Sequence, residues 1–119
     1  PTPLVFNNGG SSSINNWSTA LVTNMSNMFR NNPSFNQPIG NWNVSNVVAF
    51  ANFMQPQNST NYTPANYDNL LIGWASRPVK PNININMGTL KYTAAASAAR
   101  AILTSAPNNW TIVDGGLTV

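Results

Sequence analysis

A 25-residue internal repeat is the sequence feature that most constrains how this chain folds. Residues 14–17 read Ile-Asn-Asn-Trp and return 25 positions later as Ile-Gly-Asn-Trp at residues 39–42, and the same offset pairs Met25 with Phe50. The matched Ile, Trp, Met and Phe positions are uncommon letters in a chain with 22 Asn residues, so composition alone does not produce the register. Repeat units of about 20–29 residues bury their apolar positions by stacking on one another, so the repeat predicts a stack of similar coils.

The spacing of apolar residues changes within one unit. Trp42 and Val44 alternate with polar residues, as in a strand, whereas Val47, Phe50 and Phe53 step by three, as in a helical turn. This change predicts a strand followed by a helical or 3₁₀ return in each unit. It also predicts that the regularly placed Trp, Phe and Met side chains form the core. The expected strand anchors are Trp17, Trp42, Ile85 and Trp110.

Two segments of the second half carry helix signals. Thr63 precedes Pro64, which is the order of an N-cap and a first helical residue, and a mostly apolar run follows up to Ser76. An Ala-rich segment runs from Thr93 to Leu103, and Ala is the best helix former. Pro107 lies beyond it and ends the helix.

The patterns together predict an α/β solenoid with about four short parallel strands and two C-terminal helices. The 119 residues are expected to form one repeat domain, 1–119. Within it we expect coils over about residues 6–35 and 36–60, and a closing region over about 61–119.

The scarcity of ionisable residues excludes several kinds of catalytic site. Charged residues make up 6% of the chain, and there is no His and no Cys. This rules out Cys/His zinc sites, Ser-His-Asp and Cys-His nucleophiles, haem ligation and a disulfide framework. The two carboxylates, Asp68 and Asp114, lie 46 positions apart. We therefore expect a non-enzymatic protein with no catalytic residue, no metal ligand and no cofactor.

Charge and hydropathy also bear on the class of partner. The five Lys and Arg residues are scattered along the chain, whereas nucleic-acid binding requires a dense cationic patch. No stretch reaches the length of about 18 apolar residues that a membrane span needs. The sequence predicts neither nucleic-acid binding nor membrane insertion.

The repeat unit resembles those of the BspA-like leucine-rich-repeat surface proteins. Their units read approximately Ile-Gly-x-Trp-[Asn/Asp]-[Thr/Val]-Ser-x-Val-Thr-x-Met-x-x-Met-Phe. Residues 39–47, Ile-Gly-Asn-Trp-Asn-Val-Ser-Asn-Val, are close to that pattern, and residues 17–29 also follow it. The second unit departs at residues 48–50, which read Val-Ala-Phe where Thr-x-Met is usual.

The resemblance extends into the second half of the chain. Residues 66–74, 91–95 and 110–116 look like the segment that closes such arrays. The resemblance implies leucine-rich-repeat-like coils exposed on bacterial surfaces, where they serve adhesion and partner binding. Similar repeats in phage virion proteins look like tail-fibre or capsid-decoration modules.

The strand alternation predicts a neutral polar face. Functionally, such a face suits the hydroxyls of a glycan or the backbone of a protein; alternatively, its amides form a ladder that hydrogen-bonds to itself. The outward-facing residues, by the alternation described above, are Asn16, Ser18, Asn41, Asn43, Ser45, Asn82, Asn84 and Asn86.

A second candidate surface lies at the N-terminal end. Phe6-Asn7 looks like the tail of a preceding coil, and an uncapped coil exposes apolar side chains. We expect this end to contact another domain or another copy of the chain through Leu4, Val5, Phe6 and Ile14.

Two functions remain open from the sequence. The first is an extracellular, cell-surface or virion module that adheres to a protein or glycan on a cell surface. The second is a structural building block of a virion, as a tail fibre or capsid decoration, or of an extracellular filament, held together by self-contacts.

Overall fold

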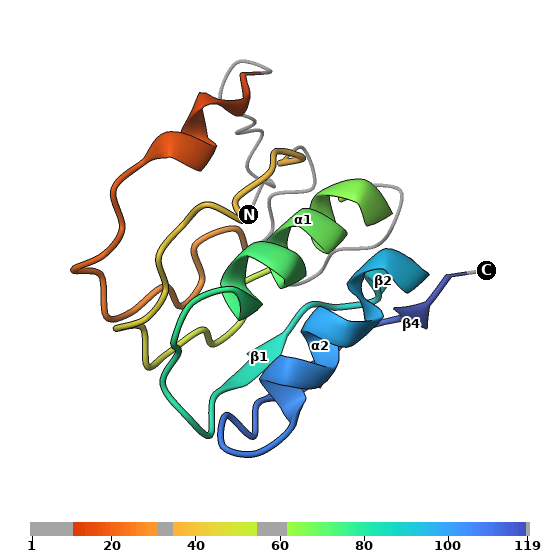
Figure 1. The fold of residues 1–119 in the computed structure, drawn as a ribbon. Coiled ribbons are helices and arrows are strands. Elements are labelled where there is room, and N and C mark those ends of the chain that lie inside the picture. Colours follow the sequence, from red (N-terminus) through yellow and green to blue (C-terminus); the bar gives the residue numbers. More distant parts are fainter. Residues whose placement is uncertain (1–10, 31–34, 55–61, 119) are drawn as a thin grey trace.

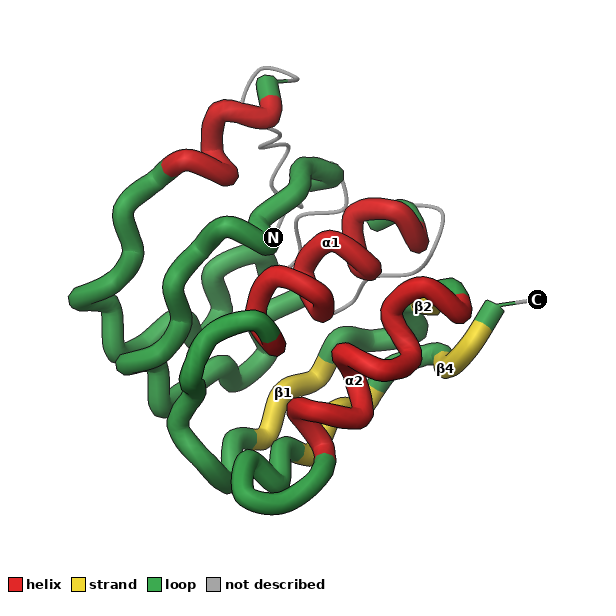
Figure 2. Tube along the Cα trace, viewed as in Figure 1, coloured by secondary structure: helices red, strands yellow, loops and turns green. Residues whose placement is uncertain are grey.

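The structure, a computed structural model, describes residues 11–30, 35–54 and 62–118 (Figure 1). Regular elements are concentrated in the last of these ranges, and most of the chain before residue 54 runs as turns and loops (Figure 2). In chain order the elements are η2 (Ser12–Asn16), α1 (Pro64–Ala75), β1 (Asn84–Asn86), β2 (Lys91–Tyr92), η3 (Ala94–Ala96), α2 (Ser97–Thr104), β3 (Thr111–Val113) and β4 (Gly116–Leu117).

Helix α1 begins and ends where its local signals predict. The hydroxyl of Thr63 accepts a hydrogen bond from the backbone N–H of Asn66 at 3.4 Å, and Pro64 occupies the first turn. The helix ends at Ala75, with Ser76 as its C-cap. The predicted helix is confirmed, and its inner face buries Tyr67, Leu70, Leu71 and Trp74.

The second predicted helix is also confirmed, although its first turn is a 3₁₀ turn. The Thr93 hydroxyl caps η3 by accepting from Ala95 N at 3.2 Å, and α2 continues directly to Thr104, before Pro107. Figure 1 shows α1 and α2 side by side, with the loops of residues 17–30 and 35–54 on the opposite side of α1.

Strand pairing is short and parallel throughout the described part of the chain. Strand β1 pairs with β3, placing Ile85 opposite Ile112, and β2 pairs with β4 in a separate sheet. Two isolated parallel bridges, Asn24 to Ala49 and Phe50 to Ile85, continue the β1–β3 pairing toward the first half of the chain.

The prediction of an α/β solenoid built from leucine-rich-repeat-like coils is wrong, although the described residues do contain four short strands paired in parallel. The strands of the described residues form two separate two-stranded sheets. The radius of gyration, 13.2 Å, is that of a compact globular domain of this length, about 13–14 Å. Of the expected anchors, Ile85 lies in β1 and Trp110 directly precedes β3, whereas Trp17 and Trp42 lie outside the strands.

The error has a local cause. The N–H of Trp42 donates to the carbonyl of Ile39 at 3.1 Å, and that of Val47 donates to Val44 at 3.0 Å. These are turn hydrogen bonds between residues three apart. The alternating burial of Trp42 and Val44 therefore comes from successive turns, which mimic the two-residue period of a strand.

The two repeat units nevertheless lie against each other in the register of the repeat. Three backbone N–H groups of the first unit donate to carbonyls of the second at 2.7–3.0 Å, namely Met25 to Ala49, Asn27 to Ala51 and Phe29 to Phe53. One indole bond, from Trp42 to the carbonyl of Ile14, also joins the two units. The indoles of Trp74 and Trp110 donate in the same way to the carbonyls of Ile39 and Lys80.

The regularly placed aromatic residues form one continuous core. Phe50, for example, contacts the rings of Phe53, Trp74 and Trp110 at centroid distances of 5.2–5.7 Å. The core prediction is wrong for two residues of the first unit, because Trp17 is 52% exposed and Met28 40% exposed.

Candidate functional site

The short parallel pairings align side chains from three segments that are distant in sequence. Phe50, Ile85 and Ile112 face the protein interior in one row, set by the bridge to β1 and the β1–β3 register. Because side chains alternate along extended chain, the residues on either side of this row point outward. On the outer face the second unit contributes Ala49 and Ala51, β1 contributes Asn84 and Asn86, and β3 contributes Thr111 and Val113.

This outer face is hollowed into an open groove of about 620 Å³, which we call the amide groove. Its hollow shape follows from side-chain size, since Ala49 and Ala51 stand beside the larger Asn84 and Asn86. The lining residues are Val48, Ala49, Phe50, Ala51, Asn52, Asn82, Asn84, Ile85, Asn86, Thr111 and Val113.

None of the residues that line the amide groove is ionisable. Two of its amides have partners in the protein: Asn86 Oδ1 accepts from the N–H of Gly88 at 2.8 Å, and Asn52 Nδ2 donates to Asn27 Oδ1 at 3.3 Å. The side-chain amides of Asn82 and Asn84 make no hydrogen bond within the described part of the chain, and both residues are exposed. The groove therefore presents neutral donors and acceptors to a ligand.

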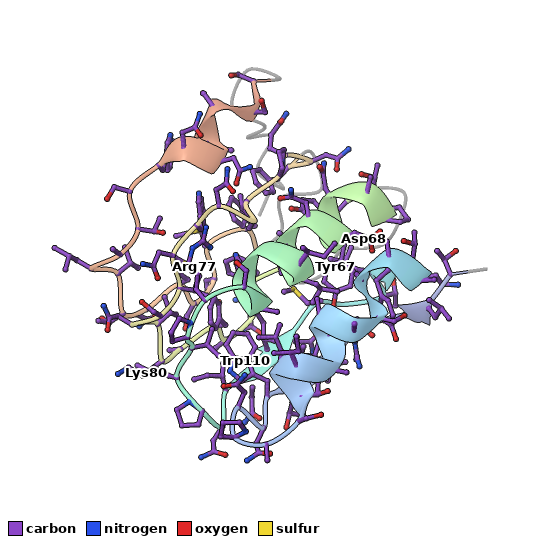
Figure 3. The ribbon with its side chains drawn as sticks, in the orientation of Figure 1. Tyr67, Asp68, Arg77, Lys80 and Trp110 are labelled. Atoms are coloured by element: carbon purple, nitrogen blue, oxygen red, sulfur yellow. The ribbon has the colours of Figure 1, made fainter. Side chains whose placement is uncertain are left out.

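The two carboxylates, Asp68 and Asp114, lie outside the amide groove and accept hydrogen bonds from other parts of the protein. Asp114, whose side chain is 2% exposed, accepts hydrogen bonds from the hydroxyl of Tyr67 at 2.5 Å and from Arg100 Nε at 2.9 Å. Asp68 accepts from the backbone N–H and the hydroxyl of Thr93, which ties α1 to η3. Figure 3 places Tyr67 and Asp68 on the side of α1 that faces α2.

The electrostatics of this cluster favour a neutral Tyr67 phenol and a charged Arg100 guanidinium. Burial raises the pKa of Tyr67 well above 10, and its bond to the negative Asp114 raises it further. Burial alone lowers the pKa of Arg100, but the hydrogen bond and charge of Asp114 outweigh it, so the net direction is upward. Both groups keep a fixed protonation state at neutral pH. Among the described residues, no three potential metal-ligating side chains come together.

A family model described as "Mycoplasma protein of unknown function, DUF285" matches residues 4–87. The chain belongs to the DUF285 family. The match spans well over half of the 119 residues, covering both repeat units, α1 and β1. Neither a curated protein nor a solved structure shows significant similarity to the chain. The helices that the structure describes are all too short or too polar to cross a bilayer.

The eight residues of the polar face predicted for this DUF285 chain do not lie on one surface in the structure. Asn82, Asn84 and Asn86 line the amide groove, while the other five residues lie outside it. Asn16 and Ser18 are exposed at the end of η2. The remaining three belong to the turns of residues 40–46: Asn41 N donates to Asn15 Oδ1 and Asn43 Oδ1 accepts from Ser45 N.

The predicted N-terminal contact falls mostly outside the described residues, since Leu4, Val5 and Phe6 lie there. The fourth residue, Ile14, is 1% exposed, and its carbonyl accepts the indole hydrogen bond of Trp42. Its side chain is thus part of the core.

Sequence reasoning missed the groove residues of the second unit, Val48, Ala49, Ala51 and Asn52. The signal that identifies them was present, because the 25-residue offset pairs Met25 with Phe50. Taking those two positions as the inward row, in place of Trp17 and Trp42, places Ala49 and Ala51 on the outer face.

Proposed function

We propose that this DUF285 chain is a non-enzymatic recognition module, displayed on a bacterial cell or a phage virion, that adheres through the amide groove. The observation that carries the proposal is a solvent-open groove whose lining is wholly uncharged and whose Asn82 and Asn84 amides are unpartnered within the described residues. Pockets that combine apolar surface with a few convergent polar groups are the usual form of binding sites.

Two further points support the proposal: the first favours binding over catalysis, and the second favours display on a surface. Thr111 is the single hydroxyl residue among the groove residues, and no lining residue is a base that activates it. The repeat unit resembles that of BspA-like surface proteins, with which the DUF285 family is associated. Surface display rests on this resemblance.

The test is attachment of the purified, fluorescently labelled chain to fixed cultured epithelial cells. We expect saturable attachment that changes little between about 0.05 and about 0.5 M NaCl, because a neutral contact is not screened by salt. The variant Ala51→Trp, which fills the groove, should weaken attachment by about tenfold or more.

The matched control is Ala65→Trp, an equally large change at an exposed position of α1 outside the groove. Both variants must retain the wild-type melting temperature. Attachment that Ala51→Trp and Ala65→Trp weaken equally, or leave unchanged, would contradict the assignment of adhesion to the groove.

A second candidate function, a building block of a virion or filament, is favoured by exposed apolar side chains on the first unit. Trp17, Leu21 and Met28 are 52%, 91% and 40% exposed. Association through these side chains predicts a mass that rises with concentration in analytical ultracentrifugation. Leu21→Asp should abolish the rise, whereas Ile102→Asp on α2 should not; a concentration-independent monomer would exclude this function.

A further inference from the structure

We infer that the amide groove binds an uncharged, extended peptide segment that lies along β1, with its backbone held by the amides of Asn84 and Asn86. The inference rests on the proposed recognition function and names the class of partner. It concerns the outer face of the paired segments rather than a strand edge, since the groove crosses Ala49, Asn84 and Thr111, which occupy neighbouring segments in one register.

The spacing of the amides carries the argument. Same-face residues of a strand lie about 6.6–6.8 Å apart, and the same distance separates equivalent backbone groups of an extended peptide. Asn84 and Asn86 stand two residues apart on β1, whereas Asn82 lies before the strand with a left-handed backbone and is not part of this spacing. A peptide aligned with β1 therefore meets an amide at two successive two-residue repeats, at Asn84 and at Asn86.

The chemistry of the amides matches a peptide backbone. A primary amide carries both a carbonyl acceptor and N–H donors, so Asn84 can pair with the C=O and N–H groups of a peptide. Its side chain makes no hydrogen bond within the described residues, so pairing with a peptide breaks no internal bond. Asn86 uses its Oδ1 on Gly88, which leaves its Nδ2 to donate.

The rest of the lining selects the side chains of the peptide. Ala49 and Ala51 leave room over the second unit, and Val48 and Val113, 59% and 50% exposed, provide apolar walls. Small apolar or hydroxyl side chains fit this space, and the lack of any counter-charge disfavours charged ones. Phe50, the single aromatic residue of the lining, is 1% exposed, so the groove offers no ring on which a sugar stacks.

The probe is an array of synthetic decapeptides built from Ala, Ser, Thr and Val, with an array of neutral oligosaccharides beside it. We expect a subset of peptides to bind, and Asn84→Leu to weaken the best of them by about tenfold or more. N-methylation of alternate backbone amides of that peptide, made in both alternations, should abolish binding in one of them, because it removes the N–H group that donates to the side-chain carbonyl of Asn84.

The matched control is Asn16→Leu, the same change at an exposed Asn outside the groove, which should leave affinity within about twofold. The absence of peptide binding, equal losses in the two variants, or full binding of both N-methylated peptides would overturn the inference. Oligosaccharide binding that Asn84→Leu abolishes would also overturn it while leaving adhesion through the groove intact. Failure of the proposed function is seen separately, as cell attachment that Ala51→Trp does not change.

Discussion

Trp42 Nε1 donates a hydrogen bond to the backbone carbonyl oxygen of Ile14 at 2.7 Å, joining residues 28 positions apart. Both residues are 1% exposed, so water does not replace this bond when it is lost. The same contact recurs between Trp74 and Ile39 at 3.0 Å. Each of these indole rings therefore fills the core and also donates a hydrogen bond to a buried carbonyl of an earlier segment. The bond holds the backbone of that segment against the ring.

Replacing Trp42 by Phe keeps an aromatic ring but removes the donor. We expect Trp42→Phe to lower the free energy of unfolding by about 1–3 kcal/mol, from the lost indole hydrogen bond and the lost ring volume, while the carbonyl of Ile14 keeps the bond it accepts from the N–H of Trp17. Urea denaturation measures the change. The control is Trp17→Phe, since Trp17 is 52% exposed and its indole has no hydrogen-bond partner in the described part of the chain. Equal losses in the two variants would contradict a role for the indole bond.

Gly73 lies inside α1, where Ala normally stabilises a helix by about 1 kcal/mol. Here a Cβ would collide with the backbone carbonyl of Gly40, which packs directly against the helix. We therefore expect Gly73→Ala to destabilise the protein by about 1–3 kcal/mol in urea denaturation.

The neighbouring exposed position, Ile72, supplies the control for Gly73. There, Ile72→Ala should be more stable than Ile72→Gly by about 1 kcal/mol, as helix propensity dictates. If Gly73→Ala is also stabilising, the close approach of Gly40 to α1 is not present in solution.

The helices were predictable because their signals are local. Thr63 and Pro64 specify the start of α1 through one side-chain bond and one fixed φ, and no distant contact is needed. The Ala-rich sequence after Thr93 likewise specifies helix by intrinsic propensity. These are properties of adjacent residues, so reading the chain in order recovers them.

The groove was only partly predictable, because its register depends on contacts between distant segments. Asn84 and Asn86 were found through the two-residue alternation of a true strand. Ala49 and Ala51 were missed because the turns around Trp42 imitate that alternation, and the bridge of Phe50 to Ile85 decides which segment lies beside β1. Sequence period does not distinguish a strand from successive turns when both bury every second residue.

Asn27 and Asn52, one repeat apart, both adopt left-handed backbone conformations, with φ of 62° and 56°, and their side chains are joined by a hydrogen bond of 3.3 Å. Such conformations are tolerated by Gly and Asn and cost other residues about 1–2 kcal/mol. We expect Asn27→Val to lower the free energy of unfolding by about that amount, and Asn27→Gly to cost less. The check is chemical denaturation; equal effects of Val and Gly would show that backbone strain is not the cause.

Stability at alkaline pH should depend on two buried tyrosines. Tyr62 and Tyr67 are fully buried, and burial raises the pKa of each far above its ordinary value of 10.0. The folded state then holds protons that the unfolded state releases above about pH 10, so stability is complete below that pH and falls above it. The expected slope is about 1.4 kcal/mol per pH unit for each tyrosine.

Urea denaturation at a series of alkaline pH values measures this slope, and tyrosinate absorbance should appear for Tyr62 and Tyr67 together with unfolding. The variant Tyr62→Phe removes one of the two ionisations. It lowers stability at neutral pH, because the carbonyl of Gln37 loses the hydrogen bond it accepts from the hydroxyl at 2.7 Å, yet it should halve the alkaline slope. A slope that Tyr62→Phe leaves unchanged, or tyrosinate absorbance from these residues in the folded protein, would show that the phenols are accessible to water.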